Sequence, residues 1–145
     1  MIYLLAAFYG VMVGNYTTSA YFRIPQGMPV NGLNNVLGKK PHCSVCKHEL
    51  KFYEYLPVLS WIFARFSCNY CNTAINPMYF IIEVATTISS LIIVAFLGMA
   101  PSFAMGVLVA SMIILNLALF ISHKKFYPKA ILGFVVVALS QILIQ

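Results

Sequence analysis

Long apolar runs constrain the fold of this chain more than any other feature of its sequence. Residues 2–22, 78–98 and 101–121 are each about 20 residues long, enough to cross the roughly 30 Å hydrocarbon core of a bilayer as a helix. Residues 130–145 form a shorter run that predicts a partial fourth span. Only 8% of the chain is charged, against about 25% in soluble proteins. We therefore expect an all-α integral membrane protein with three to four transmembrane helices.

The first run has two interpretations, a retained helix and a cleaved signal peptide. A signal peptide begins with a basic region, but here the first charge is Arg23, which follows the run. A retained helix with an external N-terminus is therefore expected.

Basic residues lie in two segments and predict the orientation of the chain. Six lie between residues 23 and 65, three lie in the stretch ISHKKFYPK (residues 121–129), and the 97–102 turn has none. By the positive-inside rule, both basic segments are cytoplasmic and the turn is external. The net charge of +6 is thus a topology signal first, with attraction to anionic membrane lipid as a second effect. Binding to nucleic acid is not expected.

The expected organisation alternates membrane spans with cytoplasmic loops. A helix over residues 1–23 precedes a four-cysteine loop over residues 24–75; helices at 76–98 and 101–121, a basic loop at 122–129 and the partial helix at 130–145 follow. Proline, glycine and asparagine break regular structure early in the first loop. A segment of about 50 residues is too small for much of a core of its own and needs a cross-link.

The four cysteines supply a candidate for that cross-link. They form two pairs, Cys43-x2-Cys46 and Cys68-x2-Cys71, with 21 residues between the pairs. Each pair can direct two thiolates at one point, so two pairs complete a tetrahedron around zinc. Two disulfides, free structural thiols and a redox-active pair are the alternatives, and a reducing cytoplasm disfavours disulfides. We expect a closed structural zinc site in a small cytoplasmic subdomain.

His42 and His48 flank the first cysteine pair. They could replace a ligand, but four cysteines already suffice. Both are expected to be solvated loop residues.

Three stretches of the sequence resemble the type IV prepilin peptidases, a family of membrane aspartic proteases that cleave and N-methylate prepilins. GNYTTSAYFRIP (residues 14–25) is similar to the family's GSFLNVVIYRLP, and INPMYFIIE (residues 75–83) is similar to ISxRYPLVE. Between them, CSVCKHELKFYEYLPVLSWIFARFSCNYC (residues 43–71) resembles CPxCxxxIxxxENIPxLSWLxLRGxCxxC. The resemblance covers most of residues 10–130. It implies a multi-pass protein of the bacterial inner membrane with a zinc-bound cytoplasmic loop, associated with type IV pili or type II secretion.

The resemblance also implies a peptidase site of two membrane-embedded aspartates, which this sequence does not supply. In ISHKKFYPK, Ser122 stands at the position of the first catalytic aspartate, and Lys129 stands at the position of the aspartate after the proline. The second catalytic aspartate belongs to a GxGD motif further along than residue 145, so we interpret the chain as a truncated member. We expect no catalytic residue here, because an aspartic protease needs two carboxylates that share a proton.

A serine–lysine pair at Ser122 and Lys125 is the alternative catalytic arrangement. Basic residues directly after a transmembrane helix are far more often topology anchors. The anchoring interpretation is therefore preferred.

Four charged residues kept from the family pattern are candidates for structural or substrate-positioning roles: Arg23, Glu54, Arg65 and Glu83. Glu83 follows the start of a predicted membrane helix. It either reaches the membrane interface or, if it lies deeper, pairs with Arg23 or Arg65. The retained glutamate favours the ion pair.

Three functions fit these observations. The leading hypothesis is a prepilin-peptidase-like pseudoenzyme that binds prepilin or other pilus or secretion assembly proteins. The second is half of a split peptidase and N-methyltransferase, with the aspartates supplied by a second chain. The third is a zinc-stapled membrane scaffold unrelated to pilins. A neighbouring gene that encodes GxGD would favour the second.

Overall fold

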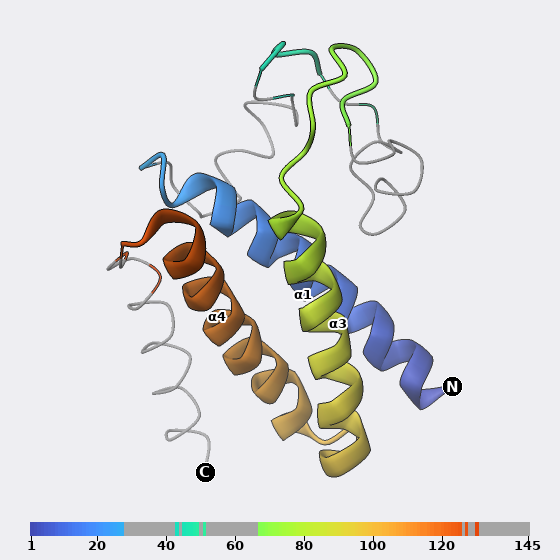
Figure 1. Ribbon diagram of the computed structural model, residues 1–145. Coiled ribbons are helices and arrows are strands. Elements are labelled where there is room, and N and C mark those ends of the chain that lie inside the picture. Colours follow the sequence, from blue (N-terminus) through green and yellow to red (C-terminus); the bar gives the residue numbers. More distant parts are fainter. Residues whose placement is uncertain are drawn as a thin grey trace.

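The computed structural model describes residues 1–27, 43, 45–49, 51, 67–125, 127 and 130. Within these residues it is helical, with α1 at Ile2–Arg23, α3 at Met78–Leu97 and α4 at Pro101–His123. The helices α3 and α4 run side by side in opposite directions, and α1 crosses α3 obliquely (Figure 1). The helical fold is therefore confirmed. The predicted partial span at 130–145, apart from Ala130, lies outside the described residues, as does most of the 24–75 loop.

Local sequence explains where α3 and α4 end. Gly98 has a φ of +64° and its N–H donates to the Val94 carbonyl, which closes the last turn of α3. Pro101 occupies the first turn of α4, where its missing N–H costs nothing. At the other end of α4, Lys124 takes a left-handed conformation and its N–H donates to the Phe120 carbonyl. Gly98 and Pro101 together form a tight connection between two long helices.

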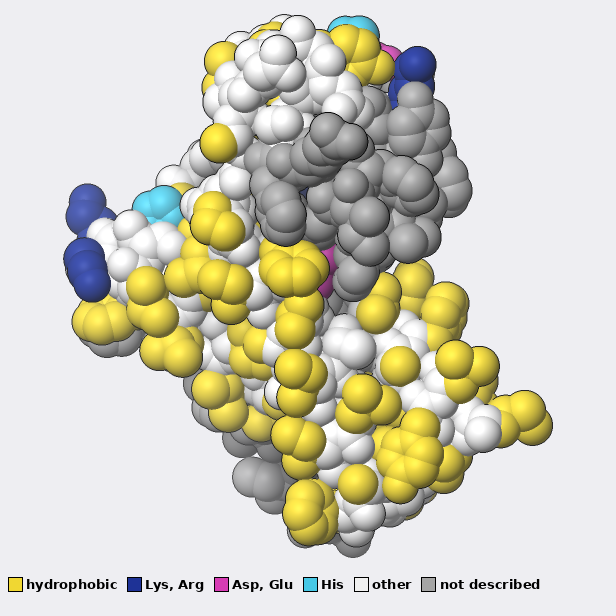
Figure 2. Space-filling view, turned by 45° about the vertical axis from the view of Figure 1, so that its right-hand side comes forward, with side chains coloured by type: hydrophobic (Ala, Val, Ile, Leu, Met, Phe, Trp, Pro, Cys, Tyr) yellow, Lys and Arg dark blue, Asp and Glu magenta, His cyan; other side chains and the backbone are white. Residues whose placement is uncertain are grey.

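Two of the described helices are long and apolar enough to cross a membrane, α3 with 20 residues and α4 with 23. Only 28% of the most apolar stretch of each is buried inside the protein, so the remaining residues of each stretch are at least partly exposed at the surface. Figure 2 shows hydrophobic side chains spread over the helical part of one face. The helix α1 has 22 residues but does not meet the same criterion of apolarity. The first predicted span therefore stays a prediction.

Glycines allow α1 and α3 to pack very closely where they cross. A Cβ atom added at Gly10 would lie 2.8 Å from Ser90 Cβ, and one added at Gly14 would lie 3.2 Å from Glu83 Cα. The Ser90 hydroxyl donates across the contact to the Ala6 carbonyl at 2.7 Å. Two glycines four residues apart let helix backbones approach in this way in membranes.

Small polar side chains as well as apolar ones fill the space between the helices. Hydroxyl groups of Thr17 and Thr86 donate to carbonyls four residues earlier in their own helices, so their polar atoms are satisfied without water. Among the described residues, the buried serines and threonines are Thr17, Thr18, Thr86, Ser90 and Ser111. The interior of the helix bundle therefore contains small polar residues as well as apolar ones.

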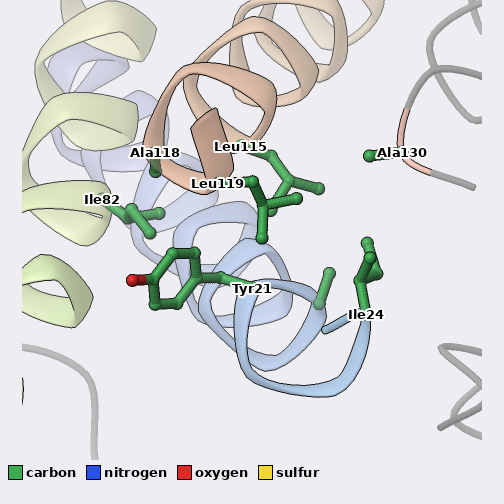
Figure 3. Close-up of a cluster of buried hydrophobic side chains, with 8 residues drawn as sticks. Tyr21, Ile24, Ile82, Leu115, Ala118, Leu119 and Ala130 are labelled. Carbon is green, nitrogen blue, oxygen red and sulfur yellow. The ribbon is translucent and has the colours of Figure 1, made fainter. Parts of the chain in front are cut away.

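Apolar side chains form two buried clusters at opposite ends of the bundle. One cluster joins Ala6 of α1, Val94 of α3, and Phe103 and Val107 of α4. The other joins the C-terminal ends of α1 and α4 to the start of α3, and Figure 3 shows its side chains converging from the three helices. Its members are Ala20, Tyr21, Ile24, Ile82, Leu115, Ala118, Leu119 and Ala130. This second cluster fixes the relative positions of the helix ends that carry the candidate site residues.

The glycine contact predicts a position-specific effect on stability. Gly10→Ala should lower the free energy of unfolding by about 1–3 kcal/mol, the usual cost of overpacking, because the new Cβ would also lie 2.9 Å from the Thr87 Cα. Denaturant unfolding in detergent, followed by circular dichroism, measures this change.

Gly106→Ala is the matched control. Among the described residues, its Cβ would meet the ends of the Ile93 side chain, at 3.3 and 3.7 Å, and alanine favours a helix over glycine by up to about 1 kcal/mol. This variant should be neutral or stabilised. Equal losses in the two variants would contradict the close packing of α1 on α3.

Candidate functional site

The four cysteine sulfurs converge on one point. The Sγ atoms of Cys43 and Cys71 are 3.8 Å apart, those of Cys46 and Cys68 are 3.9 Å apart, and all four lie within 4.8 Å of one another. Four sulfurs about 2.3 Å from a tetrahedral metal ion lie about 3.8 Å from each other. The arrangement therefore fits a metal ion held by four thiolates. Cys68 is buried and Cys46 is exposed.

Two turns with the same backbone hydrogen bonds bring the sulfurs together. In each turn the first cysteine accepts a hydrogen bond from the N–H four residues later and donates its own N–H to the carbonyl five residues later. The N–O distances are 3.1 and 3.0 Å in residues 43–48 and 2.9 and 2.9 Å in residues 68–73. The residue after each second cysteine, Lys47 or Asn72, has a positive φ, of 59° and 52°. This repeated conformation directs both thiols of a pair to one side.

The thiols differ in acidity because their neighbours differ. Hydrogen bonds with the side chain and the backbone of Thr73 lower the pKa of Cys71 to about 6, and the two side-chain atoms are 3.2 Å apart. At Cys46 a backbone hydrogen bond with His48 favours the thiolate. Desolvation and hydrogen bonds with the other three cysteines outweigh it and raise the pKa to about 11. A metal ion would bind by displacing the protons of these thiols.

The cysteine turns lie at the end of the bundle where α1 and α4 finish and α3 begins (Figure 1). Lys and Arg side chains gather toward this end, away from the apolar helix surface (Figure 2). The described members are Arg23, Lys47, Lys51, Lys124 and Lys125. A four-thiolate site with a divalent ion would carry a net charge of −2, which Lys47, within the first cysteine turn, would partly offset.

Ser122 lies in the last turn of α4 and contacts α1. The Tyr21 hydroxyl donates a hydrogen bond to Ser122 Oγ at 2.7 Å. Tyr21 is buried, with 3% of its surface exposed, and Ser122 is exposed. The position at which the sequence resemblance expects an aspartate therefore holds a hydroxyl that joins two helix ends.

Aromatic rings also pack against Tyr21, the donor of this hydrogen bond. The ring of Tyr21 lies edge-on to that of Tyr79, with centroids 5.5 Å apart, and 6.1 Å from that of His123. His123 in turn contacts Tyr127 at 5.9 Å. The rings connect α1, α3, α4 and the basic segment that follows α4.

Glu83 is buried, with 5% of its surface exposed, where α3 meets Gly14 of α1. Arg23 is partly exposed at the end of α1. The proposed pairing of Glu83 with Arg23 or Arg65 stays a prediction, because Arg65 lies outside the described residues, as do Glu54, Lys129 and His42. His48 lies within the described residues, and its side chain is exposed.

Sequence reasoning did not identify Tyr21 as a partner of Ser122 or Thr73 as a partner of Cys71. A tyrosine near the end of a membrane helix is common at the interface, and nothing in the sequence connects it to a residue 101 positions later. A threonine two residues after a cysteine is a weak local signal for a hydrogen bond to sulfur. Both contacts depend on the folded chain.

Comparisons with known proteins identify relatives of this chain. A family model described as the bacterial peptidase A24 N-terminal domain matches residues 8–97. The chain is 25% identical over 143 residues to the prepilin leader peptidase/N-methyltransferase of Pseudomonas putida, covering 88% of this chain and 49% of that protein. The protein of the same name from Dichelobacter nodosus is 34% identical over 59 residues, which cover 41% of this chain and 21% of that protein. The one from Myxococcus xanthus is 29% identical over 77 residues, which cover 53% of this chain and 21% of that protein.

The chain spans at most about half the length of these three curated relatives. No solved structure matches it significantly.

The Tyr21–Ser122 hydrogen bond predicts coupled effects on stability. Tyr21→Phe and Ser122→Ala should each lower the free energy of unfolding by about 1 kcal/mol, the usual net value of one hydrogen bond. The double variant should lose no more than the larger single loss, because both changes remove the same bond. Unfolding in detergent measures all three variants, with the exposed Tyr16 changed to Phe as the control. Additive losses would show that the two hydroxyls do not interact.

Proposed function

This chain belongs to the family of the bacterial peptidase A24 N-terminal domain, and we propose that it is an inner-membrane protein of the prepilin-processing system that does not cleave prepilin by itself. The matched relatives are named prepilin leader peptidase/N-methyltransferase, which supports prepilin as its binding partner and pilus or secretion assembly as its setting. Two apolar helices of spanning length support the membrane location.

The observation that carries this proposal is the hydrogen bond from Tyr21 to Ser122. Aspartic proteolysis needs one ionised carboxylate to activate water and one protonated carboxyl group to polarise the peptide carbonyl. A serine hydroxyl does not ionise in that range, and this one already accepts a hydrogen bond that connects two helices. The 145 residues contain three acidic side chains and no aspartate. The contribution of this chain is therefore binding and positioning.

We expect the purified chain, reconstituted in lipid vesicles with a prepilin, to bind the prepilin and leave it uncut. Ser122→Asp should also leave it uncut, because one aspartate is half of the required pair. The Pseudomonas putida relative is the positive control, and a shortened prepilin detected by mass spectrometry is the readout. The proposal would be refuted if the unmodified chain cleaved the prepilin and the Ser122→Ala variant did not.

The same assay tests the split-enzyme alternative. A second polypeptide that carries a GxGD motif is added to the vesicles with this chain. Cleavage that requires both polypeptides would favour a split peptidase. Failure to bind prepilin in any combination would favour a scaffold unrelated to pilins.

We further propose that the metal ion is zinc and that its role is structural. The support is the donor set: four thiolates suit zinc, and a tetrahedron closed by four cysteines leaves no position for a substrate. Cys43, Cys46, Cys68 and Cys71 would hold the ion. When bound, it cross-links residues 43–51 to residues 67–77, two segments that would otherwise depend on a small core.

Elemental analysis of the purified protein should find one zinc ion per chain. Cys43→Ser or Cys71→Ser should remove most of it, because each leaves three thiolates, whereas His42→Ala should retain it. Metal-free protein whose four thiols react freely under native conditions would contradict a zinc site.

The orientation that we propose places the cysteine-bearing end in the cytoplasm and the N-terminus outside. Its support is the gathering of Lys and Arg at that end and the lack of basic residues in the 97–102 turn. In intact cells, a membrane-impermeant thiol reagent should label Ser102→Cys and not Ser122→Cys. Labelling at position 122 alone would reverse the orientation.

A further inference from the structure

The two cysteine turns have the same backbone but use one equivalent position differently. His48 and Thr73 each supply the carbonyl that accepts the N–H of the first cysteine of their turn. The Thr73 hydroxyl stays within its own turn, 3.2 Å from Cys71 Sγ. The His48 ring instead crosses to the other turn and lies against Tyr70, with ring centroids 3.5 Å apart and ring planes 31° apart.

Tyr70 stands between the two cysteines of the second turn in the sequence, so the ring contact joins the His48 side chain to the turn that carries Cys68 and Cys71. Its equivalent in the first turn is Val45, and both are exposed, at 42% and 60%. His48 thus holds the two turns in two ways. Its backbone closes the first turn, and its ring contacts the second.

We propose that His48 and Tyr70 form a clamp that positions the two cysteine turns for metal binding. This inference rests on the proposed metal site and goes beyond it by assigning two residues that are not ligands. The cysteine pairs are separated by 21 residues, so bringing them together costs chain entropy. A contact between the turns offsets part of that cost before the ion arrives, and preorganisation of this kind raises affinity.

The clamp predicts a defined pattern of metal affinity in the full chain in detergent. Competition for Zn²⁺ against a chromophoric chelator measures the Kd. His48→Ala and Tyr70→Ala should each raise the Kd about two- to tenfold, the range expected for one aromatic pair. The double variant should be no weaker than the weaker single variant. Val45→Ala changes the equivalent position of the first turn and should leave the Kd unchanged.

Conservative variants distinguish a positioning role for His48 and Tyr70 from a role as metal ligands. His48→Phe and Tyr70→Phe keep a ring at each position, so both should bind Zn²⁺ about as well as the unmodified chain. The absorption spectrum with Co²⁺ should show four thiolate ligands in every one of these variants, because no cysteine is changed.

Two results would overturn the clamp while the metal site stands. The first is Zn²⁺ binding that neither alanine variant weakens. The second is a loss in His48→Phe as large as in His48→Ala, with Tyr70→Ala unaffected, which would make His48 a ligand. Failure of the unmodified chain to bind Zn²⁺ or Co²⁺ would refute the metal site and the clamp together.

Discussion

The crossing of α1 over α3 at Gly10 and Gly14 sets the geometry on which the membrane part of the protein depends. In a bilayer, lipid tails are as apolar as leucine, so helices associate through close packing and hydrogen bonds rather than through the hydrophobic effect. The absence of a Cβ atom at each glycine allows the close packing, and the Ser90 hydroxyl donates the hydrogen bond to the Ala6 carbonyl. The direction of α1 is then fixed, and its C-terminal end brings Tyr21 to Ser122 at the end of α4.

The membrane part and the cysteine turns are built by different physical means. The helices are long, so backbone hydrogen bonds within each of them satisfy most polar groups, and only a few side chains are needed to hold them together. The turns are short and have little apolar surface to bury. They depend on a repeated hydrogen-bond pattern, the positive φ of Lys47 and Asn72, and convergent thiols. The stability of the cysteine turns is therefore expected to depend on a bound metal ion, whereas the stability of the helix bundle is expected to depend on close packing.

The sequence predicted the helical fold and the convergence of the cysteines, and the structure confirms both. An apolar run of spanning length can be recognised without knowing what it packs against, and the CxxC spacing alone brings two thiols together.

The contacts between helices were not predictable in the same way. In a soluble helix the buried face is the apolar one, but a helix in lipid has an apolar face on the outside as well. Thr17, Thr86 and Ser90 lie inside, and Phe96 and Leu4 lie outside, so hydrophobicity does not reveal which residues meet. Tyr21 and Ser122 are joined only because three helix ends converge.

The unequal burial of the cysteines would make a metal ion bound by them accessible mainly from one side. Cys68 keeps 4% of its surface exposed, whereas Cys46 is exposed, although the two belong to equivalent cysteine pairs. Cys46 would be the ligand most open to solvent, so a small competing chelator would reach the site from the side of residues 45–48. Cys68, in the turn that precedes α3 in the chain, would be the ligand best shielded from that chelator.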